Sequence, residues 1–149
     1  MKIALGSDHR GFGLKEKIKK YFEKSQLEYN DYGAFSEEKT DYPIIVEKVA
    51  KSIQNNECDL GILICGTGFG MCITANKFKG IRAATCYNEE TAKLSKLHNN
   101  INVLTLGANY LEIEETIKII NIWLNTEFEG GRHKKRLDEI KEIENNNMK

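Results

Sequence analysis

Residues 60–70 read Leu-Gly-Ile-Leu-Ile-Cys-Gly-Thr-Gly-Phe-Gly, an apolar run that ends in a cysteine and three alternating glycines. A short run with almost no polar residue is typical of a central parallel strand that helices cover on both faces. The glycines expose backbone N–H groups at the start of a predicted helix, which is a common way to hold an anion. This stretch therefore predicts a parallel α/β fold with an anion cradle at the end of its central strand.

The rest of the chain alternates in the same way between short β-like runs and longer helical ones. Strands are predicted at residues 2–6, 27–32, 60–65, 81–86 and 102–106, and helices at 12–24, 43–55, 70–78, 88–97, 112–128 and 132–145. The alternation implies right-handed crossovers and a Rossmann-like three-layer sandwich with a five-stranded parallel sheet. At this length we expect a single domain over residues 1–149.

Composition excludes several classes of function. The 149 residues carry 22 basic and 22 acidic side chains, so no excess of positive charge favours a nucleic-acid partner. No apolar run reaches the length of a transmembrane helix or a signal peptide, so we expect a cytoplasmic protein without a membrane partner. The four cysteines form no Cys-x-x-Cys pair, which favours reduced thiols over disulfides or a zinc site.

The glycine loop differs from the common phosphate-binding motifs. The dinucleotide fingerprint needs a third glycine where Met71 stands, and a cysteine-phosphatase loop needs an arginine at that same position. A Walker loop ends in Gly-Lys-Ser/Thr, which is also missing. What remains is a small anion cradle with a thiol at its entrance. Cys65 alone would suit a buried structural cysteine, but the glycines behind it favour a thiolate that moves a proton.

Other polar residues are candidates for the same site. Asp8 and His9 follow the first strand, where open parallel sheets bind ligands. His98 and Asn99 end the helix before the fifth strand, and we group them with the residues at this edge of the sheet. Each has a simpler alternative, because Asp8 and His9 could only close a turn and His98 could only interact with the helix dipole.

Arg132 and Arg136 lie four residues apart, so a helix would place both guanidinium groups on one face. Such a pair suits bidentate contacts with a phosphate, and a solvated charged face is the simpler alternative. His133 is expected to point elsewhere, to the surface. The helix has a thin apolar stripe and follows Gly130 and Gly131, so it either packs on its own domain or reaches a partner subunit. We favour the partner.

Short motifs along nearly the whole chain match one family of sugar-phosphate isomerases in order and spacing. They are Gly6-Ser7-Asp8-His9, Thr40-Asp41-Tyr42-Pro43, residues 61–68, Ala75-Asn76-Lys77, Gly80-Ile81-Arg82-Ala83, His98-Asn99, Asn102-Val103-Leu104 and Glu129-Gly130-Gly131-Arg132-His133. The chain thus resembles the type B ribose-5-phosphate isomerases, whose family includes the galactose-6-phosphate isomerase subunits. The resemblance implies no metal, no cofactor, and a homodimer or dimer of dimers with active sites at the subunit interface.

The resemblance also implies the reaction and the roles of residues. It implies interconversion of D-ribose 5-phosphate and D-ribulose 5-phosphate through an enediolate, in the non-oxidative branch of the pentose phosphate pathway. Cys65 is implied as the base between C1 and C2 with Thr67 assisting, and His98, with Asp8 as a candidate to assist it, as the group that opens the furanose ring. Substrate contacts are implied for Asp8, His9, Gly66, Thr67, Gly68, Phe69, Gly70, Asn99, Arg132 and Arg136.

One position departs from the family pattern. Asn109 stands where many members have an arginine in a Gly-x-Arg context, and Arg10 is a candidate replacement. Within the resemblance, the nearest alternative is an isomerase of allose or galactose 6-phosphate. Cys65 and the His98-Asn99 pair favour the pentose enzyme, because galactose-type subunits tend to vary at these positions, and a side activity on a hexose phosphate stays open. The alternative from another class is a non-catalytic phosphate or nucleotide sensor, which would need neither the thiol nor the imidazole.

Overall fold

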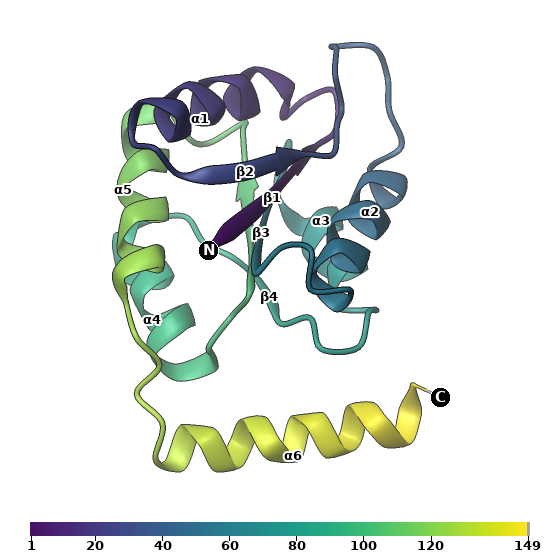
Figure 1. Cartoon of the computed structure of the whole chain (residues 1–149), viewed down its shortest axis with the longest axis vertical. Coiled ribbons are helices and arrows are strands. Elements are labelled where there is room, and N and C mark those ends of the chain that lie inside the picture. The colour runs from purple at the N-terminus through teal and green to yellow at the C-terminus, as the bar shows by residue number, and fades with distance from the viewer. Residues whose placement is uncertain (149) are drawn as a thin grey trace.

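Five parallel strands form one sheet in the order β2-β1-β3-β5-β4 in the computed structural model, which describes residues 1–148 (Figure 1). The strands are β1 (Lys2–Ser7), β2 (Glu28–Asp31), β3 (Leu60–Cys65), β4 (Ala83–Thr85) and β5 (Val103–Gly107). The helices are α1 (Phe12–Lys24), α2 (Tyr42–Gln54), α3 (Phe69–Ala75), α4 (Glu89–Asn99), α5 (Ile113–Asn125) and α6 (Arg132–Asn147). The strand order reverses between β1 and β3, and their carboxyl ends therefore form the switch point at which open sheets bind ligands.

Side chains along the central strands alternate between two apolar cores. Ile62 and Ile64 of β3 pack into a core with α1, α4 and α5, whereas Leu63 and Cys65 pack into a second core with α2 and α3. Figure 1 shows the same division of the helices between the two faces of the sheet. The three layers confirm the Rossmann-like sandwich that the sequence predicts.

The ends of the elements follow from local hydrogen bonds. The Asn88 side chain caps α4, as expected, by accepting the N–H of Thr91 at 2.8 Å in a reciprocal capping box. Helix α3 ends at Ala75, three residues before the predicted end. There the next residue, Asn76, bonds both the N–H and the C=O of Ala83 and so ties the helix end to the start of β4.

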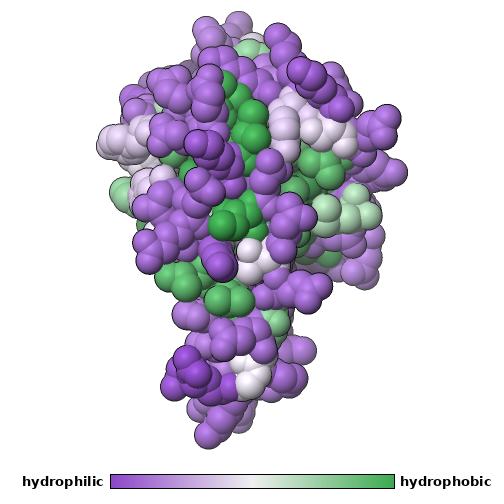
Figure 2. Space-filling view, turned by 90° about the vertical axis from the view of Figure 1, so that its left-hand side faces the viewer, coloured by the Kyte–Doolittle hydropathy of each residue, from purple (hydrophilic) through white to green (hydrophobic). Residues whose placement is uncertain are grey.

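Helix α6 stands apart from the sheet and its covering helices (Figure 1). Its main contact with another element is with the end of α4. Figure 2 shows α6 end-on as a narrow projection at the bottom of the molecule, with apolar surface visible above it. Ile140 and Ile143 on this helix are exposed. A single chain therefore leaves part of its thin apolar stripe uncovered.

The four cysteines have free side chains, and three of them, Cys58, Cys65 and Cys86, are buried. Among residues 1–148, the helices lack the length and apolar character needed to cross a bilayer.

Candidate active site

The carboxyl ends of β1 and β3 bring the first predicted site residues together. The two strands are neighbours, and the N–H of Asp8 donates to the C=O of Ile64, one residue before Cys65, at 3.2 Å. Asp8 Oδ1 accepts the N–H groups of Arg10 at 2.9 Å and Gly11 at 3.0 Å. This turn uses one carboxylate oxygen and holds the side chain beside the thiol-bearing loop.

The loop after β3 folds around the Cys65 thiol. Its Sγ accepts the N–H of Gly68 at 3.1 Å, and the residue is 6% exposed. Gly68 has a φ of +86°, which L side chains rarely adopt, and a Cβ there would lie 2.9 Å from the Thr85 methyl carbon. The N–H of Phe69 donates to Thr67 Oγ1 at 3.2 Å, so the hydroxyl hydrogen of Thr67 is free to donate elsewhere.

Close contacts between backbones fix the shape of this cradle. A Cβ on Gly107, at the end of β5, would lie 2.7 Å from the C=O oxygen of Thr67. The N–H of Asn109 donates to the C=O of Gly66 at 3.0 Å. The Phe69 ring is exposed and packs against Tyr87, whereas the backbone N–H of this predicted site residue lies in the loop and donates to Thr67 Oγ1.

His9 lies on a cleft next to the cradle, with a volume of about 460 Å³. Its Nδ1 accepts the N–H of Thr40 at 3.2 Å, which assigns the proton of the neutral ring to Nε2. Lys39 and Tyr42 also line the cleft. The Tyr42 ring covers Gly70, where a Cβ would lie 2.6 Å from it. Lys39 and Tyr42 are not among the site residues predicted from the sequence, although Tyr42 stands in the quoted Thr-Asp-Tyr-Pro motif.

Arg10 and Asn109 lie together over the cradle. From the position of a Cβ on Gly66, Asn109 Nδ2 is 3.0 Å away and Arg10 Nη1 is 3.5 Å away. The guanidinium group therefore lies beside the amide that replaces the arginine of the family pattern. If Arg10 replaces the family's arginine as a phosphate ligand, it would bind the phosphate from this position over the cradle.

His98 and Asn99 lie at the opposite edge of the sheet, which corrects the placement inferred from sequence. Helix α4 begins beyond the carboxyl end of β4 and ends before β5 starts. A crossover helix between parallel strands must return to the amino edge, so the last turn of α4 lies there. The C=O of Asn100 accepts from Arg82 Nε, just before β4, at 2.8 Å.

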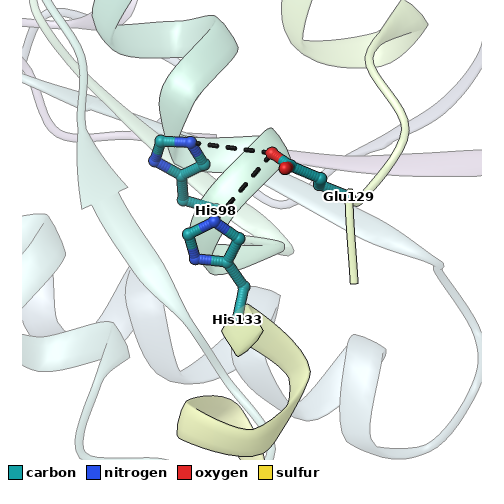
Figure 3. Close-up of side chains that lie close together, drawn as sticks. All are labelled: His98, Glu129 and His133. Atoms are coloured by element: carbon teal, nitrogen blue, oxygen red, sulfur yellow. Dashed lines mark ion pairs between the residues drawn. The ribbon is translucent and has the colours of Figure 1, made fainter. Parts of the chain in front are cut away.

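A cluster of three side chains lies at this amino edge (Figure 3). The His98 and His133 rings stack with their centroids 4.3 Å apart and their planes at 14°. Glu129 Oε2 lies 3.8 Å from His98 Nε2 and 3.9 Å from His133 Nε2. The N–H of Glu129 donates to the C=O of Leu97 at 3.0 Å, which fixes the segment before α6 onto α4.

The expectation that His133 points to the surface is wrong, because the residue is 8% exposed and covered by this docking. Burial lowers the pKa of His133, and His98, Arg132 and Arg136 lower it further, while Glu129 opposes them. A neutral His133 ring is therefore favoured. Both arginines are exposed on α6, and Asn99 lines the groove beneath that helix.

The cluster also offers three ligand atoms within 4.8 Å of one another, so a metal ion must be considered. A metal lies in the plane of each imidazole that binds it, along the lone pair of the ring nitrogen. Two rings stacked at 14° direct their lone pairs side by side rather than at one point. The arrangement favours a stacked imidazole pair, and a metal would require one ring to rotate.

The predicted site residues thus form two groups separated by the sheet. The carboxyl-edge group contains Asp8, His9, Cys65, Gly66, Thr67, Gly68, Phe69 and Gly70. The amino-edge group contains His98, Asn99, Arg132 and Arg136, to which the structure adds Glu129 and His133. Each group contains polar or charged side chains that suit a small phosphorylated ligand.

A doubly wound sheet with a thiol inside a glycine cradle at its switch point defines an α/β protein built to bind a small anionic ligand. The model of the Ribose/Galactose Isomerase family matches residues 3–140 of this chain. The chain belongs to that family, which confirms the resemblance seen in its motifs.

Individual relatives are similar over almost their whole length. Ribose-5-phosphate isomerase B of Escherichia coli K12 is 46% identical over 143 residues, 96% of each chain. The structure of Clostridium thermocellum ribose-5-phosphate isomerase B has a TM-score of 0.96 at 45% identity and covers 98% of this chain and 99% of its own. The Mycoplasma genitalium ribose-5-phosphate isomerase B crystal structure, with bound ribulose-5-phosphate, has a TM-score of 0.91 at 42% identity and covers 97% and 96%.

Proposed function

We propose that this chain interconverts D-ribose 5-phosphate and D-ribulose 5-phosphate through an enediolate, as one domain acting in pentose phosphate metabolism. The observation that carries the proposal is the Cys65 thiol, held by a backbone N–H inside the glycine cradle at the switch point. Relatives more than 40% identical bear the name of this reaction, and one of them binds ribulose-5-phosphate, which supports the same substrate class here.

The cradle supplies the groups that the proton transfer requires. The Cys65 thiolate takes the proton from C2 of the open-chain aldose, and the resulting thiol returns a proton to C1. In the proposal the Thr67 hydroxyl assists by relaying a proton from O2 to O1. A positioned base contributes typically ~10²–10⁴-fold to such a rate. Backbone N–H groups of the glycine loop stabilise the enediolate oxygen, at roughly 2.7–4 kcal/mol per donor, apart from those of Gly68 and Phe69, which already donate to Cys65 Sγ and Thr67 Oγ1.

The remaining residues bind the substrate and open its ring. Ribose 5-phosphate is mainly a closed furanose, so an acid must protonate the ring oxygen while a base takes the proton of the anomeric hydroxyl. The proposal assigns this step to His98, with Asp8 as a candidate to assist it. Arg132 and Arg136 bind the phosphate, which holds the sugar in place without taking part in the chemistry.

The complete site combines two copies of the chain in this proposal. The two groups of residues lie at opposite edges of one sheet, and α4 alone, with 11 residues, spans about 16 Å. A pentose phosphate is too short to reach from one group to the other. A homodimer, or a dimer of dimers, that sets the carboxyl edge of one copy against the amino edge of the next would complete each site.

The groove under α6 supports this assembly. It has a volume of about 500 Å³ and an apolar lining that includes Ile81, Ile101 and Ile140. Apolar surface of this kind is commonly buried in subunit contacts. The proposal therefore includes the expectation from the sequence that α6 reaches a partner subunit.

The proposal needs neither a cofactor nor a metal. Moving a hydrogen between C2 and C1 oxidises one carbon and reduces its neighbour within the same molecule, so no external electron carrier takes part. A cytoplasmic location also belongs to the proposal, and the four free thiols support it because reducing compartments preserve such side chains.

The test is turnover of ribose 5-phosphate by the purified chain in the presence of EDTA. We expect activity in the wild type and a fall in kcat of at least about 100-fold in Cys65→Ala. Cys72→Ala is the matched control, because that half-buried thiol lies outside the cradle. An inactive wild type would overturn the proposed substrate and direct the assay to hexose phosphates. Full activity in Cys65→Ala would keep the reaction and move the base, with Thr67 as the next candidate.

A further inference from the structure

His133 is a buried ionisable residue that the mechanism above does not use. Within the described residues 1–148, its Nε2 is one of the buried side-chain atoms without a hydrogen-bond partner. A buried polar atom left in this state costs free energy and calls for an explanation. The nearest candidate partner is Glu129, whose Oε2 lies 3.9 Å from it.

The contacts of His133 point to His98. The two rings stack at 4.3 Å, so His133 covers one face of the His98 imidazole and restricts its rotation (Figure 3). The His98 side chain is still 36% exposed, which leaves its other face and edges open to a ligand. The Glu129 backbone is tied to Leu97, in the last turn of α4, so all three side chains are fixed to the same helix end.

We propose that His133 is a positioning residue, which holds the His98 imidazole by ring stacking while Glu129 selects the His98 nitrogen that carries the proton. The inference rests on the assignment of ring opening to His98. With Nε2–H turned towards the Glu129 carboxylate, Nδ1 is presented to the sugar as the acid or base. The separation of 3.8 Å is longer than a hydrogen bond, and such contacts often tighten only when the substrate binds.

Two other roles for His133 fit the geometry less well. As a phosphate ligand it would use Nε2, but that atom faces the Glu129 carboxylate, which repels an anion. As a metal ligand it would need to turn out of the stack with His98. Burial, with the positive charges of Arg132 and Arg136 nearby, favours a neutral His133 ring, and a neutral ring can stack on His98 without repelling its charged form.

The chemistry of the two substrates separates a positioning role in ring opening from a general structural role. Ribulose 5-phosphate has its carbonyl at C2 and its O5 bound to phosphate, so it cannot close a five-membered ring. Exchange of its C1 hydrogen with deuterium oxide needs Cys65 but no ring opening. Turnover of ribose 5-phosphate needs both steps.

The experiment measures both readouts in His133→Ala and His133→Phe. In His133→Ala we expect kcat on ribose 5-phosphate to fall about 10-fold, with KM and C1 exchange within about 2-fold of the wild type. His133→Phe keeps a ring to stack on His98 and should recover kcat to within about 3-fold of the wild type. Lys135→Ala, an exposed neighbour on α6, is the control and should change neither readout.

His98→Asn tests the premise separately. A loss confined to ribose 5-phosphate supports the role of His98 in ring opening, whereas equal losses in both readouts overturn that premise and leave the isomerase reaction standing. For His133→Ala, an unchanged kcat, an equal loss in both readouts, or a rise in KM alone would each overturn the positioning role. Retained C1 exchange also shows that the variant is folded.

Discussion

The two edges of the sheet hold their functional groups in different ways. At the carboxyl edge, the Cys65 thiol is buried and the backbone of neighbouring strands fixes the loop around it. At the amino edge, the cluster of His98, Glu129 and His133 consists of side chains from three segments, and the Glu129 side chain is 48% exposed. The carboxyl-edge group is therefore held rigidly within one chain, whereas the amino-edge group is partly exposed, and in the proposed assembly a partner subunit and a ligand cover it.

The largest effect is expected from a single methyl group in the cradle. Gly68→Ala would strain a backbone at φ +86° and push against the Thr85 methyl group 2.9 Å away, so the N–H that faces the thiol must move. We expect kcat/KM to fall at least about 100-fold. Gly13→Ala is the control, because a Cβ there has open space and should leave activity and thermal unfolding nearly unchanged. A Gly68→Ala variant with wild-type activity would show that the backbone does not hold the cradle rigidly, in contrast to the description of the carboxyl edge above.

A mixing experiment tests whether the two edges act together across subunits. Cys65→Ala lacks a working carboxyl edge and His98→Asn a working amino edge. After subunit exchange in an equal mixture, half of the dimers are mixed, and each carries one intact site. We expect recovery to about a quarter of wild-type activity. No recovery after demonstrated exchange would mean that both edges serve one site in the same chain.

Substitution of the two arginines of α6 should weaken substrate binding and leave the chemical step unchanged, which separates their role from that of the carboxyl edge. Arg132→Ala and Arg136→Ala should each raise KM for ribose 5-phosphate about 10-fold and leave kcat within about 2-fold, because each removes a charged contact with the phosphate. Steady-state kinetics at several substrate concentrations provide the measurement. Lys141→Ala on the same helix is the control, and a loss in kcat rather than KM would place the arginines in the chemistry.

The smallest effect is expected where the chain departs from its family. Arg10 lies beside Asn109 over the cradle, and Arg10→Ala should raise KM about 3-fold if it takes over the phosphate contact. Lys17→Ala on the exposed face of α1 is the control. An unchanged KM in Arg10→Ala would remove the idea of compensation.

The sequence predicted the carboxyl edge well because its signals are local. The apolar run, the cysteine and the glycines stand within residues 60–70, which form β3, the short loop after it and the first turn of α3. The edge of the sheet at which His98 lies depends instead on the direction in which α4 runs. The connections between the strands set that direction, and the order of residues along the chain does not reveal it. Direction along a crossover helix is a property of the whole sheet.

The burial of His133 was beyond local reasoning. Helical spacing separates it from Arg132 and Arg136, which suggested an exposed side chain. Its burial depends on the docking of α6 against α4 through the Glu129 and Leu97 backbones. Neither partner carries a sequence signal of this contact, because a backbone hydrogen bond is available to almost any residue.

The placement of two half-sites on opposite edges of one sheet has a consequence for mass action. In the assembly proposed above, an isolated chain carries every residue of the site but completes no site, so we expect specific activity to fall when the protein is diluted below the dissociation constant of that assembly. Saturating sugar phosphate should oppose that fall, because a ligand held by two subunits stabilises their association. Catalysis by this chain would then report its own concentration.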